Sequence, residues 1–107
     1  MYPIRYILWV YLLKKTEEFD RWPAKLRDLR AQALIIKRLV RVGNGNLSDH
    51  KAVGDGVSEI RIDYGPGYRL YFTKKSGLVI LLLIGGDKTS QAKDIKKAKH
   101  LLKEYGE

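Results

Sequence analysis

Residues 57–74 alternate between apolar and polar side chains across a Gly-Pro-Gly sequence, and no other part of the chain limits the local fold as much. Such alternation is typical of β-strands with one buried face, and the glycines and proline favour a turn between them. The stretch is therefore predicted to be a β-hairpin. Its apolar face carries Ile60, Ile62, Leu70 and Phe72, and its polar face carries Glu59, Arg61, Asp63, Arg69, Tyr71 and Thr73.

The turn decides which residues of this hairpin face each other. A three-residue loop at residues 65–67 pairs Arg61 with Tyr71 and Asp63 with Arg69. A slip by one residue would turn the arginines into the core, where an unpaired guanidinium is costly. We expect the polar face to be exposed and to bind an anion. The alternative is a simple cross-strand ion pair between Asp63 and Arg69, which contributes about 0.2 to 1 kcal/mol.

Length and charge limit the class of protein. A chain of 107 residues is expected to form one domain, residues 1–107, around a single core. With 21 Lys and Arg against 12 Asp and Glu, the formal charge is +9, which favours nucleic acid, an anionic membrane surface or an acidic protein as partner. There is no cysteine, so disulfides, thiol nucleophiles and cysteine-based zinc sites are excluded. The apolar runs at residues 6–13 and 78–84 are far shorter than the ~20 residues of a membrane span, and we expect a soluble, cytoplasmic protein.

The first half of the chain predicts a strand and two helices. Residues 7–13 are short and apolar, as in a buried strand. Thr16 can cap a first helix, which Pro23 should either kink or end near Trp22. A second helix, ended by Gly43, has apolar residues three and four positions apart that we expect to face the core: Leu26, Leu29, Ala33, Ile36 and Val40.

The second half adds the hairpin, one more strand and a last helix. Residues 43–56 have the composition of a loop, and residues 78–84 that of a central strand, which Gly85 and Gly86 should break. Thr89 or Ser90 can cap the last helix, whose inward residues are expected to be Ile95, Ala98, Leu102 and Tyr105. The order β-α-α-β-β-β-α predicts an α+β fold, with a largely antiparallel sheet and helices packed on one face.

The side chains available for chemistry are mostly cations and a phenol: Lys51, Glu59, Arg61, Arg69, Tyr71 and Lys88. Arginine and lysine suit a phosphodiester and the charge that builds on it in a transition state. Tyr71, expected outside beside Arg61, could stack on a base or position a hydroxyl. Carboxylates interleaved with arginines, and the isolated His50 and His100, predict no metal site. No glycine motif has the strand-to-helix context of a nucleotide-binding loop, so no cofactor is expected.

Four segments carry a resemblance to a known family: T-E-E-F-D-R-W at residues 16–22, A-K-L-R-D at 24–28, V-S-E-I-R-I-D-Y-G-P-G-Y-R-L-Y-F at 57–72 and G-G-D-K-T-S-Q at 85–91. They resemble the HigB-like "addiction module killer" proteins of the RelE/ParE toxin superfamily. The resemblance covers most of residues 16–100.

This resemblance implies a RelE-like fold and a type II toxin encoded beside a helix-turn-helix, HigA-like antitoxin. RelE-like members are ribosome-dependent mRNA endonucleases that inhibit translation; without a metal, the RNA's own 2′-hydroxyl attacks and leaves a 2′,3′-cyclic phosphate. ParE-like members instead poison DNA gyrase without cutting RNA. A toxin homologue that retains only antitoxin binding is a third possibility.

The resemblance also implies roles for individual residues. Arg61 and Arg69 would bind the scissile phosphate, and Lys88 falls where related nucleases place a histidine or a basic residue near the leaving oxygen. Lys51 would neutralise a neighbouring phosphate or assist proton removal, and Asp87 would hold Lys88 or cap the last helix. The residues expected to contact RNA are Tyr71, Glu59, Lys37 and Lys93.

Overall fold

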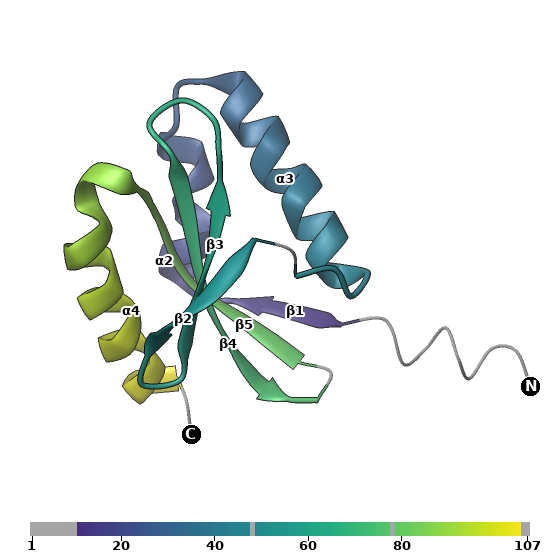
Figure 1. Ribbon diagram of the computed structural model, residues 1–107, viewed down its shortest axis with the longest axis vertical. Coiled ribbons are helices and arrows are strands. Elements are labelled where there is room, and N and C mark those ends of the chain that lie inside the picture. Colours follow the sequence, from purple (N-terminus) through teal and green to yellow (C-terminus); the bar gives the residue numbers. More distant parts are fainter. Residues whose placement is uncertain (1–10, 48, 78, 106–107) are drawn as a thin grey trace, which may run out of the picture.

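A five-stranded sheet in the order β1-β5-β4-β3-β2 forms the centre of the protein (Figure 1). The computed structural model describes residues 11–47, 49–77 and 79–105. Strand β1 pairs in parallel with β5, and the other neighbours are antiparallel. The strands are β1 (Leu12–Lys15), β2 (His50–Gly54), β3 (Val57–Ile62), β4 (Tyr68–Ser76) and β5 (Val79–Asp87). The helices are α2 (Glu17–Arg21), α3 (Leu29–Gly43) and α4 (Gln91–Tyr105), with 3-10 turns η1 (Pro23–Lys25) and η2 (Lys88–Ser90).

The predicted start and end of α2 are confirmed. The Thr16 hydroxyl oxygen accepts a hydrogen bond from the Phe19 amide at 3.0 Å, which caps the helix, and the same hydroxyl donates to the Leu83 carbonyl at 2.7 Å. Helix α2 ends at Arg21 with Trp22 as its C-cap, and Pro23 begins η1. Thr16 therefore both starts the helix and attaches it to the central strand β5. Most of the predicted strand at residues 7–13 lies outside the described residues. Within the described part, β1 begins at Leu12.

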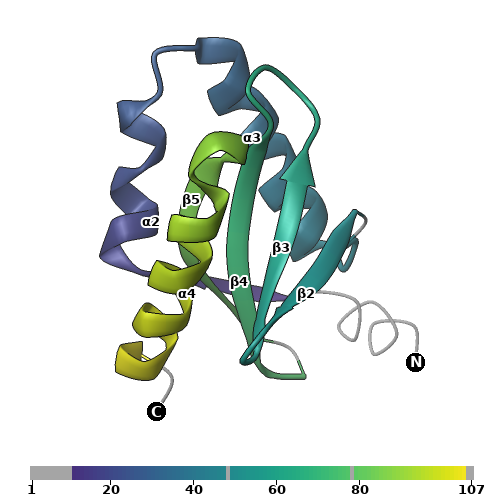
Figure 2. The same ribbon diagram turned by 60° about the vertical axis from the view of Figure 1, so that its left-hand side comes forward.

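Helices cover both faces of the sheet, whereas one helical face was expected. The α+β class and the largely antiparallel sheet are confirmed. One core, beneath α2 and α3, contains Ile60, Ile62, Leu70, Phe72, Ile80 and Leu82. The other, beneath α4, contains Val57, Tyr71, Leu81, Leu83, Ala98 and Leu101. Successive strand residues point to opposite faces, so these two sets belong to opposite sides of one sheet, and Figure 2 shows α4 and α3 on its two sides.

Helix α3 presents a different face to the core from the one expected. Ala31, Ile35 and Val42 are buried, while the exposed fractions of Leu29, Ile36 and Val40 are 76%, 61% and 58%. Both sets recur at helical spacing, so periodicity could not choose between them. The predicted inward stripe is therefore wrong at Leu29, Ala33, Ile36 and Val40, which are exposed, whereas Leu26 is partly buried against the core. Leu29, Ile36 and Val40 form an apolar stripe on the outside of the helix.

Two strands extend further than the sequence indicated. Strand β2 lies in the segment read as a loop and turns into β3 through Gly54, Asp55 and Gly56, all with positive φ. Strand β5 continues through Gly85 and Gly86, which were expected to break it. A β-carbon at Gly85 would lie 2.2 Å from Trp22 Cε3, and one at Gly86 would lie 1.8 Å from Asp94 Oδ2. These glycines allow a helix to approach the strand closely on each face.

The hairpin register differs by two residues from the expected one. Arg61 faces Arg69, Ile60 faces Leu70 and Glu59 faces Tyr71, so the connecting loop comprises residues 63–67. Gly65 and Gly67 both have positive φ in this loop. A two-residue shift leaves every side chain on its predicted face. The polar face therefore keeps both arginines, but Asp63 no longer pairs with Arg69.

Candidate functional site

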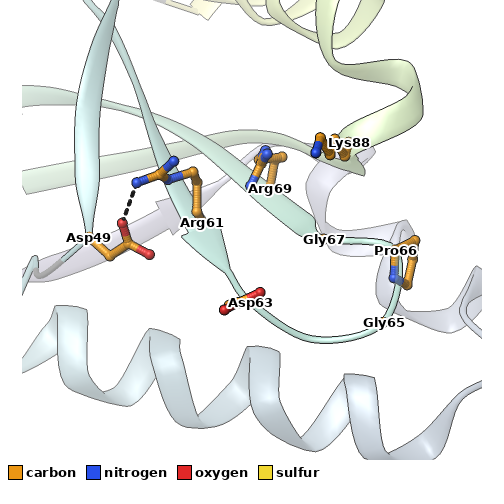
Figure 3. A pocket seen from close by; sticks show the side chains of 8 residues that line it. All are labelled: Asp49, Arg61, Asp63, Gly65, Pro66, Gly67, Arg69 and Lys88. Carbon is orange, nitrogen blue, oxygen red and sulfur yellow. Dashed lines mark hydrogen bonds and ion pairs between the residues drawn. The ribbon is translucent and has the colours of Figure 1, made fainter.

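A pocket of about 400 Å³ lies at the loop end of the β3–β4 hairpin (Figure 3). Arg61 and Arg69 come from adjacent strands, and Lys88 comes from η2, directly after β5. The structure thus brings together three of the four residues predicted to be catalytic. The complete lining is Asp49, Arg61, Asp63, Gly65, Pro66, Gly67, Arg69 and Lys88.

Arg61 and Arg69 are direct cross-strand neighbours, an arrangement that is destabilising for like charges unless other groups compensate it. Each arginine has its own carboxylate. Arg61 Nη2 lies 2.9 Å from Asp49 Oδ1, and both side chains are close to half exposed. Arg69 Nε lies 3.8 Å from Glu59 Oε2, and this pair is enclosed. Sequence reasoning missed Asp49, because it belongs to the segment read as a loop.

Glu59 and Tyr71 are fully buried, which corrects the expectation that they contact RNA. Gln91 Nε2 donates to Glu59 Oε2 at 2.7 Å, and the Tyr71 hydroxyl donates to the same oxygen at 3.2 Å. Burial and the neighbouring Glu59 carboxylate raise the pKa of Tyr71, so its hydroxyl stays protonated as a donor. Alternation placed both residues on the correct face, but α4 covers this part of that face.

Lys88 is held at the pocket by the turn that precedes α4. The Asp87 carboxylate accepts hydrogen bonds from the Thr89 amide at 2.9 Å and from the Thr89 hydroxyl at 2.6 Å, which lower the pKa of Asp87. Asp87 is therefore the N-cap of η2, and Ser90 completes a capping box with it. Asp87 thus caps the turn that leads into the last helix, and Lys88 follows it with an exposed side chain.

The other predicted cations lie outside the pocket lining. Lys51 is exposed on β2 and pairs with Glu59 of β3. Because Glu59 lies two residues before Arg61, Lys51 is on the same sheet face as the pocket but beside it. Lys93 is exposed in the first turn of α4, on that same face. Lys37 is exposed on α3, which covers the opposite face of the sheet. A ligand that reaches Lys51 or Lys93 must therefore extend beyond the pocket.

The hairpin loop is attached to the start of α3. The Tyr64 hydroxyl donates to Asp28 Oδ2 at 2.9 Å, and the Arg30 guanidinium carbon lies 5.9 Å from the centre of the Tyr64 ring. Asp28 also caps α3 through the amides of Arg30 and Ala31. The Tyr64 hydrogen bond, and after it the Ala31 and Arg30 amides, lower the pKa of Asp28. The same hydrogen bond to Asp28 raises the pKa of Tyr64. These contacts fix the loop that forms the pocket rim.

The pocket suits an anion that accepts several hydrogen bonds. Three cations and two carboxylates line it, so its formal charge is three minus two, or +1. Arginine forks and a lysine ammonium match the oxygens of a phosphate group. Among the described residues, no group of three or more His, Cys, Asp and Glu side chains is arranged to hold a metal ion. None of the helices in that part of the chain has the length and apolarity to cross a bilayer.

Comparison with known proteins finds a relative in sequence and several in fold. An uncharacterized protein of Haemophilus influenzae is 50% identical over 94 residues, which cover 88% of this chain and 95% of that protein. No family model matches the chain. A double mutant of the E. coli toxin RelE in the free state superposes with a TM-score of 0.65 at 18% identity, covering 84% of this chain and 94% of RelE.

Two further structures give the same result. A chain of the intact E. coli RelBE toxin–antitoxin complex has a TM-score of 0.55 at 20% identity, covering 72% of this chain and 95% of that one. The isolated E. coli RelE toxin has a TM-score of 0.54 at 18% identity, covering 81% and 97%. At such low identity these likenesses show that the fold is that of RelE.

Proposed function

This chain belongs to the same family as the Haemophilus influenzae protein and has the fold of RelE, and from this premise we propose that it is the toxin of a type II toxin–antitoxin system. The fold neighbours that support the proposal are a toxin and a toxin–antitoxin complex. The net charge of +9 suits a toxin whose target is RNA and whose partner is acidic. The proposed place of action is the cytoplasm, where ribosomes and mRNA are found.

The activity that this site supports best is ribosome-dependent cleavage of mRNA. The observation that carries it is the grouping of Arg61, Arg69 and Lys88, from three separate segments, around one pocket. In the proposed reaction the RNA 2′-hydroxyl oxygen bonds to the adjacent phosphorus and the bond to the next nucleotide's 5′-oxygen breaks. The products are a 2′,3′-cyclic phosphate and a free 5′-hydroxyl. No group other than the RNA itself needs to supply the nucleophile.

Each lining residue has a part in that reaction. Arg61 and Arg69 bind the two non-bridging oxygens, on which negative charge builds in the transition state. Lys88 approaches the pocket from another side and stabilises or protonates the leaving 5′-oxygen. Asp49 and Asp63 are the lining carboxylates, the type of group that can accept the 2′-hydroxyl proton. Lys51 neutralises a neighbouring phosphate along the same sheet face.

The proposed partner is a helix-turn-helix, HigA-like antitoxin, and α3 offers a surface for one. Its outer stripe of Leu29, Ile36 and Val40 is apolar and well exposed. The helix contains Arg30, Lys37, Arg38 and Arg41 but no aspartate or glutamate. An amphipathic antitoxin segment with acidic flanks would match both the apolar stripe and the charges beside it.

The test is growth arrest after the chain is expressed without an antitoxin. Arg61→Ala and Arg69→Ala should each reduce cleavage about 10²- to 10³-fold, the usual effect of removing one charge-stabilising donor, and should abolish arrest. Arg27→Ala, which removes an exposed arginine outside the pocket lining, is the matched control and should still arrest growth. Arrest that persists in both pocket variants would mean that this pocket is not the toxic site.

A further inference from the structure

The two pocket arginines are held in different ways. Arg61 and its partner Asp49 are both exposed by more than two fifths, so solvent screens this pair and either side chain can move. The Arg69 side chain is only 11% exposed, and its partner Glu59 is 0% exposed. Glu59 cannot rotate into solvent without displacing the helix that covers it. Arg69 is therefore enclosed at its base, although it lines the pocket.

Glu59 is fixed in place by two elements. Gln91 is the first residue of α4, and Tyr71 faces Glu59 across the β3–β4 pair. Both donate to Oε2, the carboxylate oxygen that also lies nearest to Arg69 Nε. Two hydrogen bonds from neutral donors orient the carboxylate but do not cancel its charge. A buried carboxylate is costly without a cation, and Arg69 is the cation within ion-pair distance of it among the described residues.

The pairing is incomplete within the protein. Among the described residues, Glu59 Oε1 and Arg69 Nε are buried without a hydrogen-bond partner. The Nε–Oε2 separation of 3.8 Å gives an ion pair but exceeds the length of a hydrogen bond. Glu59 thus attracts Arg69 electrostatically without accepting a hydrogen bond from its Nε. The adjacent Arg61 repels Arg69, so the buried carboxylate also offsets the repulsion between these two neighbours.

We propose that Glu59 is a positioning residue, which holds the Arg69 guanidinium in the pocket so that it meets a phosphate without first reorganising. Gln91 and Tyr71 orient the Glu59 carboxylate for this purpose. That the phosphate is the scissile group of mRNA rests on the proposed function. The geometry of Arg69 in the free protein is independent of that proposal. Arg61, by contrast, must exchange Asp49 for the phosphate when the ligand binds.

Glu59→Gln tests this inference because it removes the charge and keeps the shape. The glutamine oxygen can still accept from Gln91 and Tyr71. Two measurements follow the change: NMR of the Arg69 Nε–Hε group in the free protein, and the rate of reporter mRNA cleavage. Thr73→Val is the matched control, since Thr73 is buried on the same face of β4 and its hydroxyl donates to the Gly56 carbonyl, away from Arg69.

The expected result is a shifted Nε–Hε signal with a lower order parameter, because the guanidinium loses the charge that restrains it. Cleavage should slow about 10²-fold, as for a misplaced catalytic group. In an Arg69→Ala background Glu59→Gln should have no further effect on cleavage, because residues that act together are not additive. Thr73→Val should leave the Arg69 signal unchanged.

An unchanged Arg69 signal in folded Glu59→Gln would overturn the inference, and so would effects on cleavage that simply add to those of Arg69→Ala. If Glu59→Gln does not fold, Gln91→Leu removes one orienting donor and must move the same signal. If the wild-type protein cuts no mRNA, the proposed function fails, and the NMR measurement still decides whether Glu59 positions Arg69.

Discussion

Gly85→Ala tests the close packing between α2 and the central strand. The added β-carbon would lie 2.2 Å from Trp22 Cε3 and 2.4 Å from two further ring carbons. Carbon atoms in contact lie about 3.5 to 4.0 Å apart, so the ring must retreat by more than about 1 Å. The Trp22 ring also packs against Phe19 and Tyr68, with ring centres 5.9 Å and 6.2 Å away. Those neighbours limit its retreat.

The expected cost is at the upper end of the range for overpacked cores, about 3 kcal/mol of unfolding free energy. For 107 residues the unfolding entropy is about 0.22 kcal/mol/K, so the midpoint of thermal unfolding should fall by about 13 °C. Circular dichroism during heating measures it. Gly77→Ala is the control, because a β-carbon there would meet no atom within 4 Å, and its effect should stay within about 0.5 kcal/mol. A Gly85→Ala midpoint within about 2 °C of wild type would refute the close packing described here.

Three further predictions concern other parts of the molecule. Hydrogen bonds lower the pKa of Asp28 below 3.8. The stability that Asp28 adds relative to Asp28→Asn should therefore be full near neutral pH and disappear as the pH falls through the lowered pKa. Urea titrations of both proteins across that pH range measure this difference. Ile36→Ser and Val40→Ser should each weaken antitoxin binding about tenfold, or ~1.4 kcal/mol, in calorimetric titrations without stopping growth arrest. Asp49→Asn raises the formal charge of the pocket from +1 to +2 and should tighten binding of an RNA oligonucleotide about fivefold at low salt. Unchanged binding would show that the Arg61–Asp49 pair does not compete with the ligand.

Local patterns in the sequence predicted the local structure well. Alternation with period two identified both faces of the hairpin, and its assignments survived an error of two residues in register. Thr16 and Pro23 marked the limits of α2 because capping and the missing proline amide act over only a few residues. The cations Arg61, Arg69 and Lys88 were selected by their residue types and by the family resemblance, and they line one pocket.

The features that sequence reasoning missed depend on contacts between distant segments. Whether Tyr71 is exposed depends on α4, which is about twenty residues further along the chain. Two apolar stripes on α3 have the same helical spacing, and only the packed sheet distinguishes the buried one from the exposed one. Gly85 was expected to break the strand, because the sequence does not show that Trp22 packs directly against this glycine.

Primer-extension mapping of a reporter mRNA, after induction of this chain alone, tests the central claim most directly. The wild-type protein should produce cuts inside the translated region, and Arg61→Ala should eliminate them while the variant remains folded and binds antitoxin. Growth arrest with intact mRNA would contradict a nuclease acting through this pocket and would point to DNA gyrase as the target.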